Sequence, residues 1–496
     1  MTPTHSRSVP AVLLSAALLL GCSAGTDGPA GQDAASEQAA TTTLPAEPAV
    51  VLPDSDPARA ALATSQALFT AAPAVVLAPG DDPHGVEHAA ELGAPLLVVD
   101  GDAEALLAEL DRLGTDVVLA TEAARQQGAA LAAVEDAGVE VVTDPGDLPA
   151  TGPAATEGLV ALTDGSAWAA AAAATAGAAG GRVITVEDAD PRADPDVVEQ
   201  LARADATHVL ALGEAFGPPE RLAARVATAA TGTQLPGGGQ VVFPHRRMVA
   251  LYGHPGSASL GVLGEQDVED AVTRAREVAA EYEPHSDLPV VPAFEIIATV
   301  ASDDPGPDGD FSREAPVDRL RPWVDAAREA GVYVLLDLQP GTTDFLTQAR
   351  RYEDLLAEPH VGLALDPEWR LRDGQRHMEQ IGSVDAAEVN AVTQWLAGLT
   401  AERSLPQKVL VLHQFRTSMI VDRHDLDTGR DEVAVMIHAD GNGAPADKLG
   451  TWEALRAGAP EGLHWAWKNF YDEDAPTFTP EQTMDVEPAP LLITYQ

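Results

Sequence analysis

The stretch "HVGLALDPEWRL", residues 360–371, places two carboxylates at the end of an apolar run. Side chains two positions apart on a strand point to the same side, so we expect Asp366 and Glu368 to emerge together. A neighbouring carboxylate raises the pKa of a general acid toward neutral pH. The pair is therefore a candidate for acid–base chemistry, with Glu368 as the proton donor and Asp366 as its pKa partner. The indole of Trp369 follows directly and offers a flat apolar face.

Seven further segments of the C-terminal half resemble this one, with a short apolar run that ends in polar residues. Helical patterns such as "DRLRPWVDAAREAG" lie in most of the intervals between them. Eight strands separated by helices over about 250 residues are typical of a (β/α)8, or TIM, barrel. The strand segments that we predict are "MVALYGHPG", "PVVPAFEIIATVA", "VYVLLDLQPG", "VGLALDPEW", "KVLVLHQF", "VAVMIHADGNG", "LHWAWKNFY" and "LLITYQ".

Active sites of such barrels lie at the C-terminal ends of the strands. We therefore predict that a ring of strand-end residues surrounds one pocket. Lys468 stands out in this ring because it is one of only three lysines in the chain. The candidate residues at the strand ends are His254, Glu295, Asp337, Gln339, Asp366, Glu368, Trp369, His413, Gln414, His438, Asp440, Asn442, Trp467 and Lys468.

The fourth strand segment resembles the D-x-x-D-x-D-x-E motif of family 18 glycoside hydrolases. Its last two acids fall on Asp366 and Glu368, and its earlier acids fall on Val361 and Ala364. Family 25 lysozymes also end a barrel strand in D-x-E. The resemblance implies that Glu368 protonates the leaving oxygen of a glycan and that Asp366 orients the substrate or stabilises charge. Trp369 and Trp467 would then stack on sugar rings.

The C-terminal half as a whole resembles a group of uncharacterised actinobacterial secreted lipoproteins. The shared words are "LDLQPG", "ALDPEW", "IGSVDAAEVN", "LVLHQFR" and "WKNFYDED". They extend over nearly all of residues 246–496, which we assign to the barrel.

Residues 61–232 alternate short β-branched runs with Ala/Glu/Leu segments, which predicts an α/β domain with parallel strands. The pattern occurs twice, because Val75–Ala78 corresponds to Leu159–Leu162. The words "VVLAPGDDPHGVEHAAELGAPLLVVD" and "LAELDRLGTDVVLA" resemble cell wall-binding repeat type 2, which implies attachment to a wall polymer. The neighbouring segments are read as a disordered tether over 23–60 and a Gly-rich linker over 233–245.

Residues 1–22 read as a secretory signal because the apolar run Val9–Leu20 is too short to span a bilayer. The ending "LLGC" resembles the lipobox of bacterial lipoproteins, in which the cysteine is lipidated. The resemblance implies that Cys22 becomes the mature N-terminus and anchors the protein to the outer face of the cell membrane. Since Cys22 is the only cysteine, the chain forms no internal disulfide.

The formal net charge of −47 excludes nucleic acid as a natural partner, because phosphate would be repelled. The expected partners are a cell-wall or extracellular glycan and, through the lipid on Cys22, the membrane. No cofactor is expected.

Two alternatives to a glycoside hydrolase remain open at this stage. His254, His413 and His438, with nearby aspartates, could ligate a divalent metal in a metal-dependent hydrolase. The barrel could also be a non-catalytic cup that binds wall polymer, a possibility favoured by the apolar residues Val361 and Ala364 at positions where family 18 enzymes carry acids.

Overall fold

The computed structural model describes residues 40–148 and 156–496 of the 496-residue chain. The predicted signal peptide and Cys22 lie outside the described residues.

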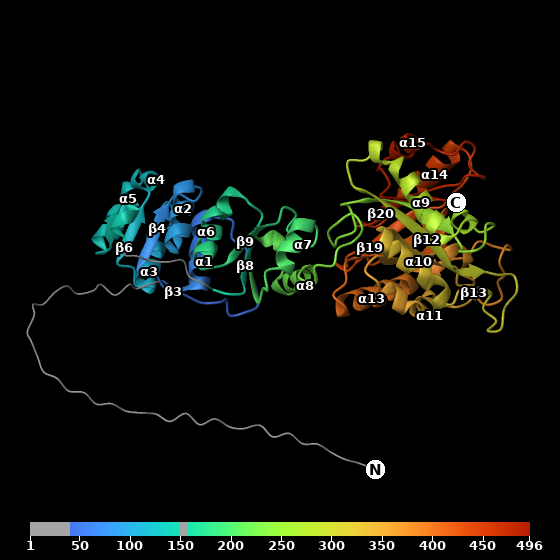
Figure 1. Ribbon diagram of the computed structural model, residues 1–496, viewed down its shortest axis with the longest axis horizontal. Coiled ribbons are helices and arrows are strands. Elements are labelled where there is room, and N and C mark those ends of the chain that lie inside the picture. The colour runs from blue at the N-terminus through green and yellow to red at the C-terminus, as the bar shows by residue number, and fades with distance from the viewer. Residues whose placement is uncertain (1–39, 149–155) are drawn as a thin grey trace, which may run out of the picture. The chain divides into compact units, whose positions relative to one another are not determined.

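Residues 247–495 form a closed barrel of eight parallel strands, as predicted (Figure 1). Each strand pairs with the next barrel strand along the chain, and the parallel pairing of the first with the second and the last closes the ring. All eight predicted strand segments are present. They are β11 (Arg247–Gly253), β12 (Val290–Ala301), β14 (Tyr333–Leu338), β15 (Val361–Leu365), β17 (Lys408–Gln414), β19 (Val433–Ala439), β20 (His464–Asn469) and β21 (Leu492–Tyr495).

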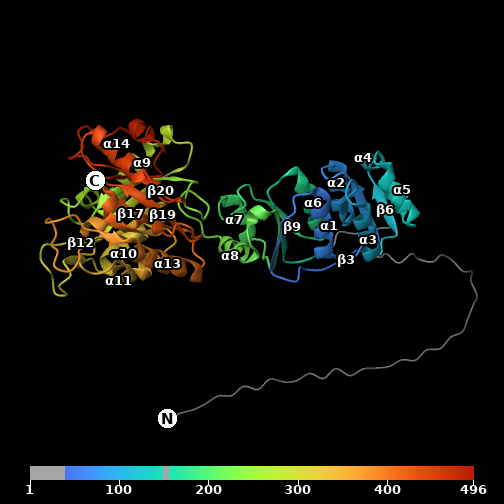
Figure 2. The same cartoon turned by 180° about the vertical axis from the view of Figure 1, so that it is seen from behind.

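Helices surround this barrel on its outer side (Figures 1 and 2). Outward-facing strand residues such as Leu336, Leu363 and Leu412 pack with helix residues such as Val324 and Leu396 in one large apolar core. The main helices of this layer are α9 (Val268–Ala280), α10 (Val317–Ala330), α11 (Phe345–Arg351), α12 (Glu353–Leu356), α13 (Ala386–Glu402), α14 (Pro445–Arg456) and α15 (Pro480–Met484). Three short strands lie in the loops: β13 (Ser312–Glu314), β16 (Val384–Asp385) and β18 (Ile420–Val421).

The described N-terminal residues contain two four-stranded parallel sheets with helices. The first sheet has the order β5 (Leu96–Val98), β4 (Ala74–Ala78), β6 (Val117–Ala120), β7 (Glu140–Val142). The second has the order β9 (Arg182–Thr185), β8 (Leu159–Thr163), β10 (His208–Leu212), β2 (Ala49–Leu52). The helices are α1 (Pro57–Leu68), α2 (Pro83–Leu92), α3 (Ala103–Leu113), α4 (Glu122–Arg125), α5 (Gly128–Asp136), α6 (Ala170–Ala178), α7 (Pro195–Ala202) and α8 (Pro219–Ala229). A short antiparallel pair joins β1 (Thr41–Thr42) to β3 (Phe69–Ala71).

The predicted tether, residues 23–60, extends too far along the chain. Strand β2 pairs in parallel with β10 and completes the second sheet, and helix α1 begins at Pro57 with Asp56 as its N-cap. The apolar run "AVVL" is the physical reason, because it supplies the edge strand that the second copy of the α/β pattern lacks in its own sequence.

The predicted linker, residues 233–245, packs against the barrel. Leu235, Val242 and Phe243 are buried together with Met248 and Ala250 in the barrel interior. Arg246 is 1 % exposed and donates hydrogen bonds to backbone carbonyls of this segment, including that of Val242. The Gly-rich segment therefore closes the N-terminal end of the barrel, opposite the strand ends that carry the polar ring.

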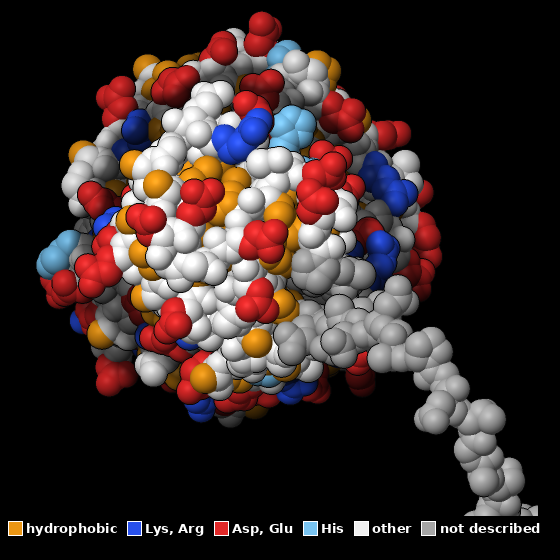
Figure 3. Space-filling model, turned by 90° about the vertical axis from the view of Figure 1, so that its left-hand side faces the viewer, with side chains coloured by type: hydrophobic (Ala, Val, Ile, Leu, Met, Phe, Trp, Pro, Cys, Tyr) orange, Lys and Arg blue, Asp and Glu red, His pale blue; other side chains and the backbone are white. Residues whose placement is uncertain are grey.

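The surface reflects the acidic composition. On the face of the N-terminal part shown in Figure 3, Asp and Glu side chains are widely spread and outnumber Lys and Arg. Among the described residues, no helix is long and apolar enough to cross a membrane.

Candidate active site

The barrel interior changes from apolar to polar at one layer of side chains. Residues such as Ala293, Leu335, Val411 and Met436 form the apolar interior. On each of the eight strands, the residue two positions after one of these apolar interior residues is polar. It stands at the C-terminal end of the strand or just beyond it. These residues are Tyr252, Glu295, Asp337, Asp366, His413, His438, Lys468 and Thr494. Because side chains alternate along a strand, all of them point inward at the C-terminal end, where barrel enzymes carry their sites.

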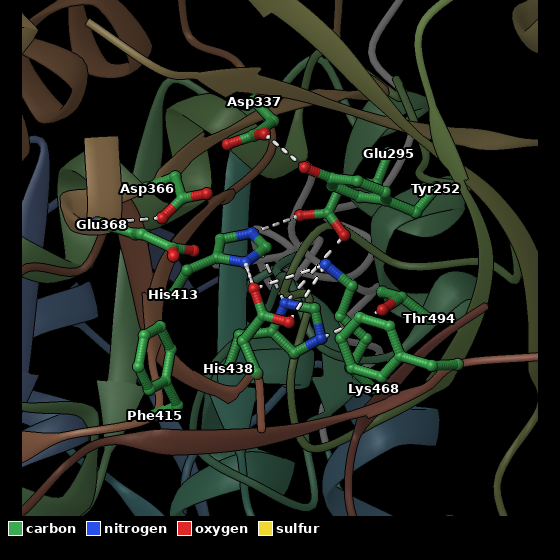
Figure 4. A network of polar contacts seen from close by, with 12 residues as sticks. Tyr252, Glu295, Asp337, Asp366, Glu368, His413, Phe415, His438, Lys468 and Thr494 are labelled. Atoms are coloured by element: carbon green, nitrogen blue, oxygen red, sulfur yellow. Dashed lines mark hydrogen bonds and ion pairs between the residues drawn. The ribbon is translucent and has the colours of Figure 1, made fainter. Parts of the chain in front are cut away.

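His413 lies at the centre of this layer, between two carboxylates (Figure 4). Its Nε2 is 2.9 Å from Oε1 of Glu295, and its Nδ1 is 2.9 Å from Oδ2 of Asp440. Lys468 completes the group, with its Nζ 3.1 Å from Oδ1 of Asp440 and 3.8 Å from the centre of the Tyr252 ring. His413 and Glu295 have no solvent-exposed area in their side chains.

The charges in this group hold one another ionised. Burial would lower the pKa of His413, but Glu295 and Asp440 outweigh it and raise that pKa well above its usual value. Burial would likewise raise the pKa of Asp440, but Lys468 and His413 lower it. A doubly hydrogen-bonded imidazolium donates from both nitrogens, so we assign His413 as a cation between two carboxylates.

His438 is the neutral member of the layer. Its Nδ1 is 3.4 Å from Nε2 of His413, and its Nε2 shares a 3.0 Å hydrogen bond with Oγ1 of Thr494. Burial and the charge of His413 lower the pKa of His438 to about 3.

A second buried acid of the same layer, Asp337, lies next to the hydroxyl of Tyr252 (Figure 4). The Tyr252 hydroxyl donates a 3.0 Å hydrogen bond to its Oδ2, and the Gln339 amide donates to the Tyr252 oxygen at 3.3 Å. Burial is the main cause that raises the pKa of Asp337 to about 7. The protonated form of this carboxyl is therefore much more favoured than that of an exposed aspartic acid.

Above this layer opens a cavity of about 600 Å³, within the range of small-molecule sites. Its floor carries the carboxyls of Asp366, Glu368 and Asp440 and the ammonium of Lys468. Its other lining residues include Gln339, Trp369, Phe415, Arg416, Asn442, Phe470 and Glu473. The cavity thus combines acids, two cations and several aromatic faces.

Asp366 and Glu368 reach the cavity from a turn and not from the strand, which corrects our prediction of a shared strand face. Strand β15 ends at Leu365, and Pro367–Trp369 form a single helical turn. Asp366 caps this turn by accepting a 3.1 Å hydrogen bond from the Glu368 backbone N–H. Gly382 supports the turn from outside, and its N–H donates to the Glu368 carbonyl at 2.8 Å.

Glu368 and Asp366 are both shifted toward their protonated forms. Burial, and after it the charge of Asp440, raises the pKa of Glu368. The sequence had suggested Asp366 as the carboxylate that raises the pKa of Glu368, but in the structure this carboxylate is Asp440. Burial also raises the pKa of Asp366 well above its usual value, and the neighbouring Asp337, Asp440 and Glu368 add to the shift.

The structure brings most of the predicted ring together, but three members lie elsewhere. His254 is turned to the backbone, with its Nδ1 2.8 Å from the Ile297 carbonyl. Gln414 directly follows the inward residue His413, and Trp467 directly precedes the inward residue Lys468. Because side chains alternate along a strand, both point outward. Trp467 is 1 % exposed and packs in the core between strands and helices, against Trp452 and Phe478.

Four aromatic or hydroxyl residues of the site were not among the predicted residues: Tyr252, Phe415, Phe470 and Thr494. The signal for Tyr252 and Thr494 was present, because each stands two positions after an apolar inward residue, Ala250 and Leu492. Phe415 and Phe470 lie in the loops that follow β17 and β20, where no periodicity applies.

The same residues include groups that could approach a metal ion, such as Asp366, His413 and Asp440. In this arrangement, the nitrogens of His413 are instead engaged by carboxylates. As an imidazolium that donates from both nitrogens, His413 has no lone pair for a metal, and it would have to lose a proton to become a ligand. His254, which the metal hypothesis also used, lies outside the cluster.

The fold and site define an α/β protein whose closed parallel barrel carries a polar, carboxylate-rich cavity at the C-terminal ends of its strands. No protein-family model matches the chain, and no curated protein matches it either.

Proposed function

We propose that the barrel is a glycoside hydrolase that acts on cell-wall or extracellular glycan. The observation that carries this proposal is a pair of carboxyls that face one cavity with opposite pKa shifts. The pKa of Glu368 is raised and that of Asp440 is lowered. Environments that separate two carboxyls in this way assign one as the acid and the other as the ionised partner.

In this mechanism Glu368 donates its proton to the glycosidic oxygen as the bond to the sugar carbon breaks. Asp440 stays ionised because Lys468 and His413 hold it so, and its negative charge stabilises the positive charge that develops on the sugar ring. A water molecule then supplies the new hydroxyl, and its remaining proton restores Glu368.

The remaining polar groups position the two carboxyls and the substrate. Asp366, which its surroundings favour as the neutral acid, offers a hydroxyl donor to a substrate oxygen. Trp369 and Phe415 line the cavity with flat apolar faces of the kind that sugar rings contact.

The cellular setting is part of the same proposal. The lipobox-like ending at Cys22 supports a lipoprotein on the outer face of the membrane, and the repeat-like α/β sheets support contact with a wall polymer. The lipid anchor is tested by mass spectrometry of the mature protein. Acylated Cys22 as the first residue supports it, and an unmodified Cys22 or cleavage downstream contradicts it.

The catalytic proposal is tested by comparing the full-length protein with Glu368→Gln on peptidoglycan and on chitin-type oligosaccharides. General-acid catalysis typically contributes about 10²–10⁴-fold, so the variant should lose most of the turnover. Glu473→Gln, which changes another carboxyl of the cavity lining, is the matched control and should retain far more. Turnover that survives Glu368→Gln unchanged removes this residue from the mechanism.

A non-catalytic glycan-binding barrel is the second candidate. It is favoured by the interior of β15, where Ala364 packs in the apolar core and no acid precedes Asp366 on the strand. Under this alternative the protein retains wall glycans without any release of reducing ends. Retention together with turnover contradicts the alternative, and retention alone supports it.

A further inference from the structure

A second depression, of about 240 Å³, lies beside the main cavity and shares Glu368 and Trp369 with it. Its remaining lining comes from one loop: His377, Met378, Glu379, Gln380 and Ile381. Both depressions therefore contact the proposed proton donor. The volume is below the roughly 300–1,000 Å³ of sites that hold a whole ligand, so it suits one unit of a longer one.

The walls of this second depression are fixed in place. Trp369 packs edge-on against His377, with ring centroids 5.4 Å apart. Nε2 of His377 is 3.0 Å from the carbonyl oxygen of Phe311, which lies in the loop before β13. The loop returns to the catalytic turn at Gly382, whose N–H donates to the Glu368 carbonyl.

The side chain of Met378 lies almost entirely in solvent, although it is apolar. It is 88 % exposed, the largest value among the exposed large apolar side chains of the described residues, and its φ of 66° is unusual for a residue with a side chain. An apolar side chain held out beside an indole makes a surface for the apolar face of a ligand.

The depression also continues away from Glu368. Gln380 and Ile381 line a third hollow of about 560 Å³ together with Ser383 and Arg416, and Arg416 in turn lines the main cavity. The hollows thus follow one another around the loop 370–383. A single sugar bound in the main cavity would leave this path unused, whereas a chain of sugars would follow it.

We propose that Trp369, His377 and Met378 form a subsite for a further sugar unit next to Glu368, so that the substrate is an internal stretch of a glycan chain rather than a terminal sugar. This inference rests on the proposed glycosidase function and specifies its substrate class.

The test uses equilibrium binding to the full-length Glu368→Gln variant, which is expected not to consume its ligand. The probes are β-1,4-linked N-acetylglucosamine chains of two to six units and glycan strands released from peptidoglycan. Affinity should rise at least tenfold from the shortest to the longest chain.

Adding Met378→Asp or His377→Ala should remove most of this gain. Adding Leu449→Ala, which truncates another exposed apolar residue, should preserve it. Because Met378 is almost fully exposed, its replacement leaves the fold intact, and a thermal melt verifies this.

The outcomes separate the two proposals. Equal affinity for short and long chains, or a gain that survives both Met378→Asp and His377→Ala, overturns the subsite while leaving the catalytic proposal standing. No binding of any chain overturns the glycan proposal and the subsite with it. A gain in affinity with chain length that Met378→Asp and His377→Ala abolish and Leu449→Ala preserves supports both the glycan proposal and the subsite.

Discussion

Nε2 of His413 lies 2.9 Å from Oε1 of Glu295, and neither side chain has any exposed area. A buried ion pair of this kind is costly to break, because removal of one partner leaves the other charge without solvent or a counter-charge. His413 is also hydrogen-bonded to Asp440, so its replacement removes the ion-pair partner of Glu295 and leaves Asp440 with Lys468 alone.

We therefore expect His413→Gln to lower the free energy of unfolding by about 3–5 kcal/mol, as measured by urea denaturation near neutral pH. His424→Gln is the matched control, because His424 is 73 % exposed and paired only with a neighbouring surface acid. Surface substitutions usually stay within about 0.5 kcal/mol. A loss of similar size in both variants would contradict the assignment of His413 as the central cation.

Asp337 should make stability fall as the pH rises. The pKa of this carboxyl is raised by burial from 3.8 to about 7 in the folded protein. Between these values the folded state holds a proton that the unfolded state has released, so stability decreases with increasing pH across this interval.

Asp337→Asn removes this dependence and keeps an oxygen that accepts from the Tyr252 hydroxyl. We expect the variant to exceed the parent at pH 8 by more than about 1 kcal/mol, the equivalent of one pKa unit, with a smaller advantage near pH 4. Urea denaturation at several pH values measures it. Asp303→Asn, at an exposed acid, should run parallel to the parent at every pH.

Strand β2 should be needed for the second N-terminal sheet. A chain that begins at residue 40 retains β2, whereas a chain that begins at residue 53 leaves the edge of β10 without its partner and uncovers apolar residues such as Val209 and Ala211. We expect the shorter chain to lose protection from proteolysis around β8–β10. Equal protection in both chains would show that β2 is dispensable.

The sequence predicted the barrel strands well, because their apolar runs are long, and the individual site residues less well. Long apolar runs such as Val409–Leu412 identified every barrel strand, and the end of each run located the polar layer. The alternation had to be counted from a known inward residue, which the sequence does not mark, so Tyr252 was missed and Trp467 was wrongly placed in the pocket. Strand β15 ends at Leu365, shortly before Pro367, and no strand rule describes the turn that carries Glu368.

Gly382 should be irreplaceable beside the turn that carries Glu368. A Cβ at this position would collide with the backbone oxygens of Pro367, Glu368 and Arg370. We expect Gly382→Ala to displace the turn and to reduce kcat together with thermal stability. Gly398→Ala provides the contrast: this glycine lies within helix α13, a Cβ there meets nothing within 4 Å, and alanine is the better helix former. That variant should be at least as stable as the parent and retain full kcat.

Two opposite charges act on the pKa of Glu368. Asp440 raises this pKa and Lys468 lowers it, so the two partners of one ion pair act on Glu368 in opposite directions. A general acid is active while protonated, and activity falls as the pH rises through its pKa. Asp440→Asn should therefore move the basic limb of the pH–rate profile to lower pH, and Lys468→Met should move it to higher pH. Both variants should also lower kcat, because each disturbs the charge that stabilises the transition state. A purely structural effect would lower kcat as well, but it would not move the basic limb in opposite directions in the two variants. Kinetics of glycan hydrolysis between pH 4 and pH 9 measure it. Limbs that move in the same direction in the two variants would assign the proton donor to a residue other than Glu368.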